Sequence, residues 1–120
     1  MRKILVVEDD PAILANTVRV LRLEGFEVHS ARNGREGLEQ VRAIKPELVL
    51  CDIRMPEMDG DELLDALRAD PATASMPVIF ATASAEISGR AERMARGASD
   101  YLIKPYDFKT LLSTIRRLLS

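Results

Sequence analysis

Three uninterrupted apolar runs, far apart in the chain, are the feature that most limits how it can fold. They are Ile4–Val7, Leu48–Cys51 and Val78–Ala81, and none of them alternates with polar residues. A strand with one solvent-exposed face alternates apolar and polar residues, whereas a strand of a parallel sheet covered on both faces is apolar throughout. The runs therefore predict the centre of a parallel sheet.

Two further segments, Glu27–Ala31 and Tyr101–Ile103, are shorter or more mixed and are typical of edge strands. Helical signals separate the strands, and they predict helices over about residues 11–24, 34–44, 60–69, 86–96 and 107–119. A strand followed by a helix, five times over, predicts an α/β doubly wound domain with right-handed crossovers. With 120 residues, 47% of them apolar, one domain over residues 1–120 is expected.

The chain's composition excludes several classes of function. Its 17 basic and 19 acidic side chains leave a net charge of -2, so we expect no direct binding of nucleic acid or of an anionic membrane. The apolar stretch before Glu8 is too short for an export signal, and no window approaches the roughly 18 apolar residues of a membrane span. The lone Cys51 lies in an apolar run, which suits a buried structural thiol in a reduced compartment. We therefore expect a cytoplasmic protein.

Polar side chains follow four of the predicted strands at the point where each ends. They are Glu8 and Asp9, Asp52, Thr82, and Lys104. The carboxyl ends of parallel strands meet at one edge of the sheet, where such folds bind their ligands. Carboxylate oxygens suit Mg²⁺, and a carboxylate that accepts a phosphoryl group needs nearby cations because both partners are anionic. The pattern predicts a divalent-cation and phosphoryl site at this edge.

Five short motifs occur in a fixed order, and together they are more specific than any one of them. They are Val7-Glu8-Asp9, the loop from Asp52 to Gly60, Ala81-Thr82-Ala83, Gly97-Ala98, and the segment from Tyr101 to Pro105. On these motifs the chain resembles, over essentially its whole length, the receiver domain of two-component response regulators. The resemblance implies the flavodoxin-like or CheY-like (βα)5 fold, with strand order 2-1-3-4-5.

The acidic residues divide into different expected roles. Asp52 is the predicted phosphoacceptor, and Asp9 and Asp52 are predicted direct Mg²⁺ ligands, with Glu8 in an outer or water-mediated position. The resemblance adds the backbone carbonyl of Arg54 as a further ligand. Asp10 precedes a proline and is interpreted as a helix cap rather than a ligand.

Two other residues complete the predicted phosphoryl site. The Lys104 ammonium would pair with a phosphoryl oxygen, and the Thr82 hydroxyl would donate to the phosphoryl group, while the small Ala83 leaves space for it. The resemblance also implies a cis peptide bond between Lys104 and Pro105.

The resemblance implies a conformational switch as well. Phosphoryl arrival would draw Thr82 toward Asp52, and Tyr101 would turn into the vacated space. The alternative is that Tyr101 is an ordinary amphipathic edge residue. The positions that influence how long the phosphoryl group lasts correspond to Arg54 and Ser84.

The resulting prediction is a phosphorylation-controlled interaction module rather than an enzyme with turnover, although it would promote its own phosphorylation and dephosphorylation. Its donor would be a histidine kinase or a histidine phosphotransfer protein. Its output face, formed by the fourth helix, fifth strand and fifth helix, would bind a downstream effector or output domain. The chain ends soon after the fifth helix, so we expect no output domain within it.

The main alternative is a Mg²⁺-dependent phosphatase with an aspartyl nucleophile, of the haloacid dehalogenase type. That class has an Asp-x-Asp motif and a cap over its site, whereas here Arg54 stands two residues after Asp52 and no cap-sized insertion is present. A nucleotide or flavin binder of the same fold would need a glycine-rich first loop, which this chain lacks.

Arginines at three-residue spacing mark the predicted fourth helix. Arg90, Arg93 and Arg96 are interpreted as a solvated helix face, with contact to a partner as the less favoured alternative. Receivers of winged-helix transcription factors dimerise through charged pairs on the output face, but Thr110 and Thr114 stand at two of those positions here. That mode of dimerisation is not expected.

Overall fold

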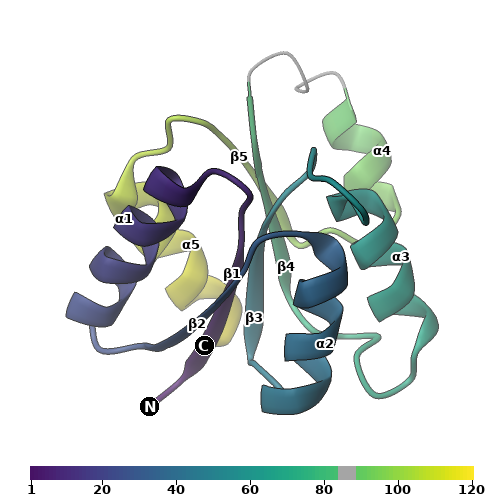
Figure 1. Ribbon diagram of the computed structural model, residues 1–120, viewed down its shortest axis with the longest axis horizontal. Coiled ribbons are helices and arrows are strands. Elements are labelled where there is room, and N and C mark those ends of the chain that lie inside the picture. The colour runs from purple at the N-terminus through teal and green to yellow at the C-terminus, as the bar shows by residue number, and fades with distance from the viewer. Residues whose placement is uncertain (84–88) are drawn as a thin grey trace.

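Five parallel strands and five helices alternate along the chain in a computed structural model that describes residues 1–83 and 89–120 (Figure 1). The strands are β1 (Lys3–Val7), β2 (Glu27–Ala31), β3 (Leu48–Asp52), β4 (Val78–Thr82) and β5 (Asp100–Ile103). The helices are α1 (Pro11–Leu23), α2 (Gly34–Ile44), α3 (Gly60–Ala69), α4 (Arg90–Ala95) and α5 (Phe108–Leu119). The strand order is β2-β1-β3-β4-β5, which confirms the predicted doubly wound fold and its two edge strands.

The sheet is buried on both faces, which explains the uninterrupted apolar runs. Along β1, Leu5 and Val7 belong to one core cluster, whereas Ile4 and Val6 belong to the other. Helices α2 and α3 supply side chains to the first cluster, and α1 and α5 supply side chains to the second. Figure 1 shows α1 and α5 on one side of the sheet and α2 and α3 on the other.

Side-chain caps set the start of most helices where the sequence predicted them. Asp10 accepts hydrogen bonds from the amides of Ala12 and Ile13, so its interpretation as a cap of α1 is confirmed. Asp107 caps α5, which therefore begins one residue later than predicted. No helix in residues 1–83 or 89–120 has the length and apolar character needed to cross a membrane.

The fourth helix differs most from the sequence prediction. It was expected over about residues 86–96, and α4 begins at Arg90, while Ser84 and residues 86–88 lie outside the described residues. The Gly89 side of α4 has no side-chain cap, and none of its residues is buried.

Cys51 is fully buried at the end of β3, as predicted for a structural thiol. Burial is the main reason that the pKa of its thiol lies well above the ordinary value, and the nearby carboxylates Asp52 and Glu8 add to the effect. The thiol therefore stays protonated and unreactive in the folded protein.

Candidate functional site

The strand ends bring three carboxylates together at one edge of the sheet. Glu8 and Asp9 follow β1, and Asp52 is the last residue of β3, which pairs with β1. One oxygen from each of the three side chains lies within 4.8 Å of the others. Glu8 is buried, Asp52 is half-buried and Asp9 is exposed, so the cluster opens to solvent at Asp9. Such an all-oxygen set could hold a hard divalent cation.

A single lysine bridges two of these carboxylates. Lys104 follows β5, and its Nζ donates hydrogen bonds to Asp52 Oδ2, at 3.0 Å, and to Glu8 Oε1. Burial lowers the pKa of Lys104, but the hydrogen bonds to Glu8 and Asp52 outweigh it and hold the pKa above the ordinary value. The side chain is therefore an ammonium fixed between two acids.

Glu8 is the most strongly perturbed carboxyl group of the site. Only 4% of the residue is exposed, and burial raises its pKa from 4.5 to about 7, with the Asp52 charge adding to the rise. The hydrogen bonds from Lys104 and from the Asp10 amide act in the opposite direction. Because the folded chain holds this proton more tightly than the unfolded chain does, the contribution of Glu8 to stability falls as pH rises from 4.5 to about 7.

The two oxygens of Asp52 are held by different partners. Oδ1 accepts from the Ile53 amide at 2.7 Å, and Oδ2 accepts from Lys104. These hydrogen bonds fix the orientation of the Asp52 carboxylate at the carboxyl edge of the sheet. Arg54, the predicted source of a backbone ligand, lies in the exposed loop two residues further on.

Close backbone contacts hold the loop after Asp52 in place. The Gly60 amide donates to the Ile53 carbonyl at 2.7 Å, and a Cβ at Gly60 would lie 2.4 Å from the Asp52 carbonyl oxygen. On the other side of the loop, the Gly34 amide donates to the Met58 carbonyl at 2.7 Å. The start of α3 is thereby packed directly against the residue that carries the central carboxylate.

Thr82 and Ala83 lie at the end of β4, between the Asp52 and Lys104 strands in the sheet. The Lys104 amide donates to the Thr82 carbonyl at 2.7 Å, which joins the two strand ends. Thr82 is buried and Ala83 is exposed. The structure thus brings both residues to the predicted edge, and the cis peptide bond between Lys104 and Pro105 is present.

Tyr101 points into the molecule in this structure. Only 6% of the residue is exposed, and its ring packs edge-on against Phe80, with 6.5 Å between the ring centroids. The Arg93 guanidinium approaches its hydroxyl, with 3.5 Å between Nη1 and Oη.

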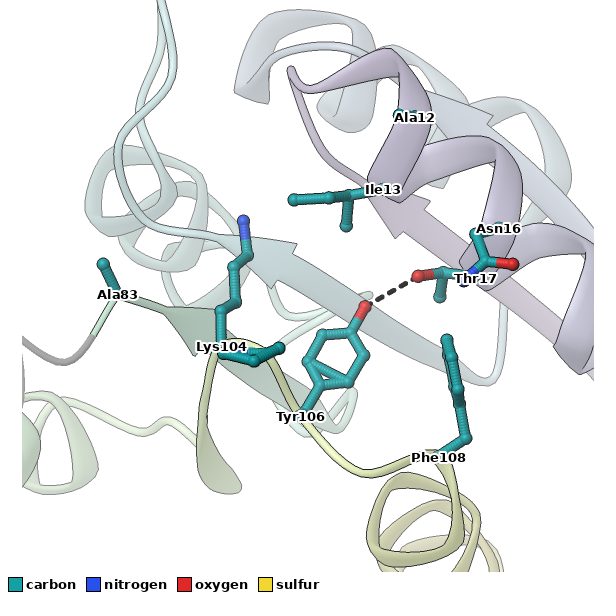
Figure 2. A pocket seen from close by; sticks show the side chains of 9 residues that line it. Ala12, Ile13, Asn16, Thr17, Ala83, Lys104, Tyr106 and Phe108 are labelled. Atoms are coloured by element: carbon teal, nitrogen blue, oxygen red, sulfur yellow. Dashed lines mark hydrogen bonds between the residues drawn. The ribbon is translucent and has the colours of Figure 1, made fainter.

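A cavity of about 480 Å³ lies beside the site, between the start of α1 and the loop that follows β5 (Figure 2). Its lining consists of Ala12, Ile13, Asn16, Thr17, Ala83, Lys104, Pro105, Tyr106 and Phe108. The Tyr106 and Thr17 hydroxyls share a hydrogen bond of 2.7 Å across it. The sequence prediction missed this pair, although a threonine within the apolar stripe of a helix was a usable signal.

The predicted solvated face of α4 is wrong for Arg93, whereas Arg90 and Arg96 are exposed as predicted. Arg93 forms a bidentate ion pair with Asp61 of α3, with both N–O distances at 2.9 Å, and only 14% of its side chain is exposed. Arg96 pairs with Asp65 of the same helix. The prediction failed because periodicity along α4 carries no information about acids on α3.

Comparison with known proteins supports the same assignment. Residues 4–116 match the family model described as the response regulator receiver domain. The chain is 37% identical over 120 residues to the protein PilH of Pseudomonas aeruginosa, covering all of this chain and 99% of that protein. It is 40% identical over 119 residues to the regulatory protein AtoC of Escherichia coli K12, covering 99% of this chain and 25% of that protein. The chain therefore belongs to the response regulator receiver domain family of two-component systems.

A solved structure shows the same arrangement. The CheY-like response regulator receiver domain protein of Methanospirillum hungatei JF-1 superposes with a TM-score of 0.91, at 34% identity, over 99% of this chain and 94% of that one. Several regulators among the curated relatives are much longer, and this chain spans about a quarter to a half of their length.

Proposed function

We propose that this domain accepts a phosphoryl group on Asp52, with Mg²⁺ bound at the Glu8, Asp9 and Asp52 cluster. The donor would be a histidine kinase or a histidine phosphotransfer protein. The observation that carries the proposal is the double pairing of Lys104 with Asp52 and Glu8 beside an all-oxygen acidic cluster. A nucleophilic carboxylate needs such cations because its phosphoryl donor is also anionic.

The acidic cluster fits the metal that this chemistry requires. Its three carboxylate oxygens are hard ligands, and one side of the cluster is open at Asp9, where water can complete the coordination. Asp9 and Asp52 would hold the ion directly, and the buried Glu8 would act in an outer position, with the Arg54 carbonyl as a further ligand. When bound, Mg²⁺ would offset negative charge on the phosphoryl oxygens.

The other steps of the phosphoryl transfer depend on residues of this chain. An Asp52 oxygen attacks phosphorus, and the new O–P bond forms as the bond between phosphorus and the donor imidazole nitrogen breaks; that nitrogen keeps the electron pair. Lys104 already touches Asp52 Oδ2, so its ammonium can follow the phosphoryl oxygens as negative charge moves onto the acceptor. Thr82 supplies a hydroxyl at the next strand end, and the exposed Ala83 leaves room beside it.

The consequence of phosphorylation would be a shift in conformation rather than repeated turnover of a substrate. We propose that Thr82 moves toward the phosphoryl group and that the inward position of Tyr101 is favoured, which changes the face formed by α4, β5 and α5. A downstream effector or output domain would read this face. Because the proposed donor is an intracellular kinase, a cytoplasmic location is part of the proposal.

A phosphatase with its own substrate is not favoured by any contact of the site. The residue two after Asp52 is Arg54, where the haloacid dehalogenase pattern requires a second aspartate.

The experiment that tests the function compares wild type with Asp52→Asn. Both proteins are incubated with Mg²⁺ and acetyl phosphate, and intact mass is measured over time. Wild type should gain the mass of one phosphoryl group, and the gain should disappear when Mg²⁺ is chelated. An equal gain in Asp52→Asn, or none in wild type, would refute the proposal.

A further inference from the structure

Helix α4 has few internal features that would stabilise it. It is six residues long, buries none of them, and has no side-chain cap at Gly89. A helix this short is unstable in isolation, so its neighbours must stabilise it.

Ion pairs to α3 are one source of that stabilisation. Asp61 of α3 pairs with Arg93 of α4, and we call this pair the α3–α4 clasp. Asp65 of α3 pairs with Arg96, the C-cap residue of α4, which also lies 3.9 Å from Asp61. The Asp61–Arg93 pair is the better shielded, with 22% and 14% of the two side chains exposed, whereas Asp65 and Arg96 are 56% and 36% exposed. Its bidentate geometry and partial burial make it the stronger of the two.

The end of α4 has a separate attachment to α3. The Arg68 guanidinium donates to the Gly97 carbonyl from Nε at 3.1 Å and from Nη2 at 2.8 Å. Loss of the Asp61–Arg93 pair therefore leaves this end of the segment bound, and the domain should still fold.

Arg93 reaches a second residue. While two of its nitrogens bind Asp61, Nη1 lies 3.5 Å from the Tyr101 hydroxyl. That distance is at the long end for a hydrogen bond, so most of the attraction is between the guanidinium charge and the hydroxyl dipole. Asp61 thus fixes the cation that faces the inward Tyr101.

We infer that Asp61, by orienting Arg93, holds Tyr101 in its inward position and thereby favours phosphorylation of Asp52. This inference depends on the proposed function, in which phosphorylation favours the same position of Tyr101. Two interactions that stabilise one conformation reinforce each other, so removal of the clasp must make phosphorylation less favourable. Asp61 and Arg93 touch neither the acidic cluster nor Lys104 among the described contacts, so they act as positioning residues.

The test follows Tyr101 without any phosphoryl donor. The protein contains two tyrosines, so biosynthetic fluorotyrosine gives two fluorine NMR signals, and Tyr106→Phe assigns them. Asp61→Asn and Arg93→Met should shift the Tyr101 signal toward its solvent-exposed position. Asp65→Asn makes the same charge change on the same helix at a residue that pairs with Arg96 rather than with Arg93, and it should leave the signal unchanged.

The second readout is the ratio of phosphorylated to unphosphorylated protein at steady state, measured by intact mass at one concentration of acetyl phosphate with Mg²⁺. Asp61→Asn should lower that ratio by about fivefold, and Asp65→Asn should not. An unmoved Tyr101 signal in both Asp61→Asn and Arg93→Met, equal effects of the clasp and control variants, or a released Tyr101 with an unchanged ratio would each overturn the inference. If no protein gained a phosphoryl group, the proposed function would fail, and the NMR comparison would still decide whether Asp61 holds Tyr101.

Discussion

At the scale of single residues, the three adjacent acids that follow β1 differ in their partners and in their exposure to solvent. Asp10 accepts two amides of the first turn of α1 and is occupied as a cap. Glu8 is buried against Lys104, and Asp9 is exposed within the acidic cluster. Three carboxylates in a row therefore do not form one site.

The variants Asp9→Asn and Asp10→Asn distinguish metal binding from helix capping, because each removes one negative charge at one of two neighbouring positions. Asp9→Asn should weaken Mg²⁺ binding by about tenfold or more, because a candidate direct ligand loses its charge. Asp10→Asn should bind Mg²⁺ nearly as wild type does, and it should keep its stability because asparagine caps helices as well as aspartate does. Calorimetric titration with Mg²⁺ measures the affinity, and equal losses in the two variants would contradict this division.

At the scale of elements, the site depends on the contact between the start of α3 and the end of β3. Asp59 and Glu62 form a reciprocal capping box, so backbone N–H groups at the start of α3 have hydrogen-bond acceptors within the first turn. Gly60, which follows Asp59 in the chain, lies so near the Asp52 carbonyl that no side chain fits at this position. The helix start thus fixes the backbone of the proposed phosphoacceptor.

Gly60→Ala should therefore destabilise the domain, even though alanine is the better helix former. The added methyl would approach the Asp52 carbonyl oxygen to 2.4 Å, and the overpacking should cost about 1–3 kcal/mol. Glu39→Ala is the control, because its side chain is 71% exposed on α2 and the change should fall within about 0.5 kcal/mol. Urea unfolding measures both, and a Gly60→Ala protein as stable as wild type would show that the contact relaxes freely.

At the scale of the whole molecule, folding itself places like charges together. The unfolded chain separates Glu8 from Asp52, whereas the folded chain brings the oxygens of Glu8, Asp9 and Asp52 within 4.8 Å, with the Lys104 ammonium bridging Glu8 and Asp52. A cation that binds only the folded cluster should therefore stabilise the domain.

Mg²⁺ should raise the midpoint of thermal unfolding of wild type. At a free concentration about 100-fold above its dissociation constant, it should add about 2.7 kcal/mol to the free energy of unfolding. Calorimetry with and without Mg²⁺ at constant ionic strength measures the effect, and Asp9→Asn should show much less of it. The same shift in that variant would mean that the ion acts elsewhere.

Patterns in the sequence alone predicted the fold and the edge of the sheet at which the candidate site residues lie. Runs such as Leu48–Cys51 are apolar on both faces only when helices cover both sides of a sheet, and parallel strands must end at a common edge. Local patterns also predicted the cap at Asp10, since a cap depends only on the next few residues.

Contacts between side chains of different elements became visible only in the folded structure. The Asp61–Arg93 pair joins residues 32 apart, and the Thr17–Tyr106 hydrogen bond joins residues 89 apart. Such contacts depend on the relative rotation of packed elements, and periodicity within one element does not encode that rotation. The sequence predicted Lys104 as a residue of the site. That Glu8 and Asp52 share its ammonium depends on how three strand ends meet, and only the fold showed it.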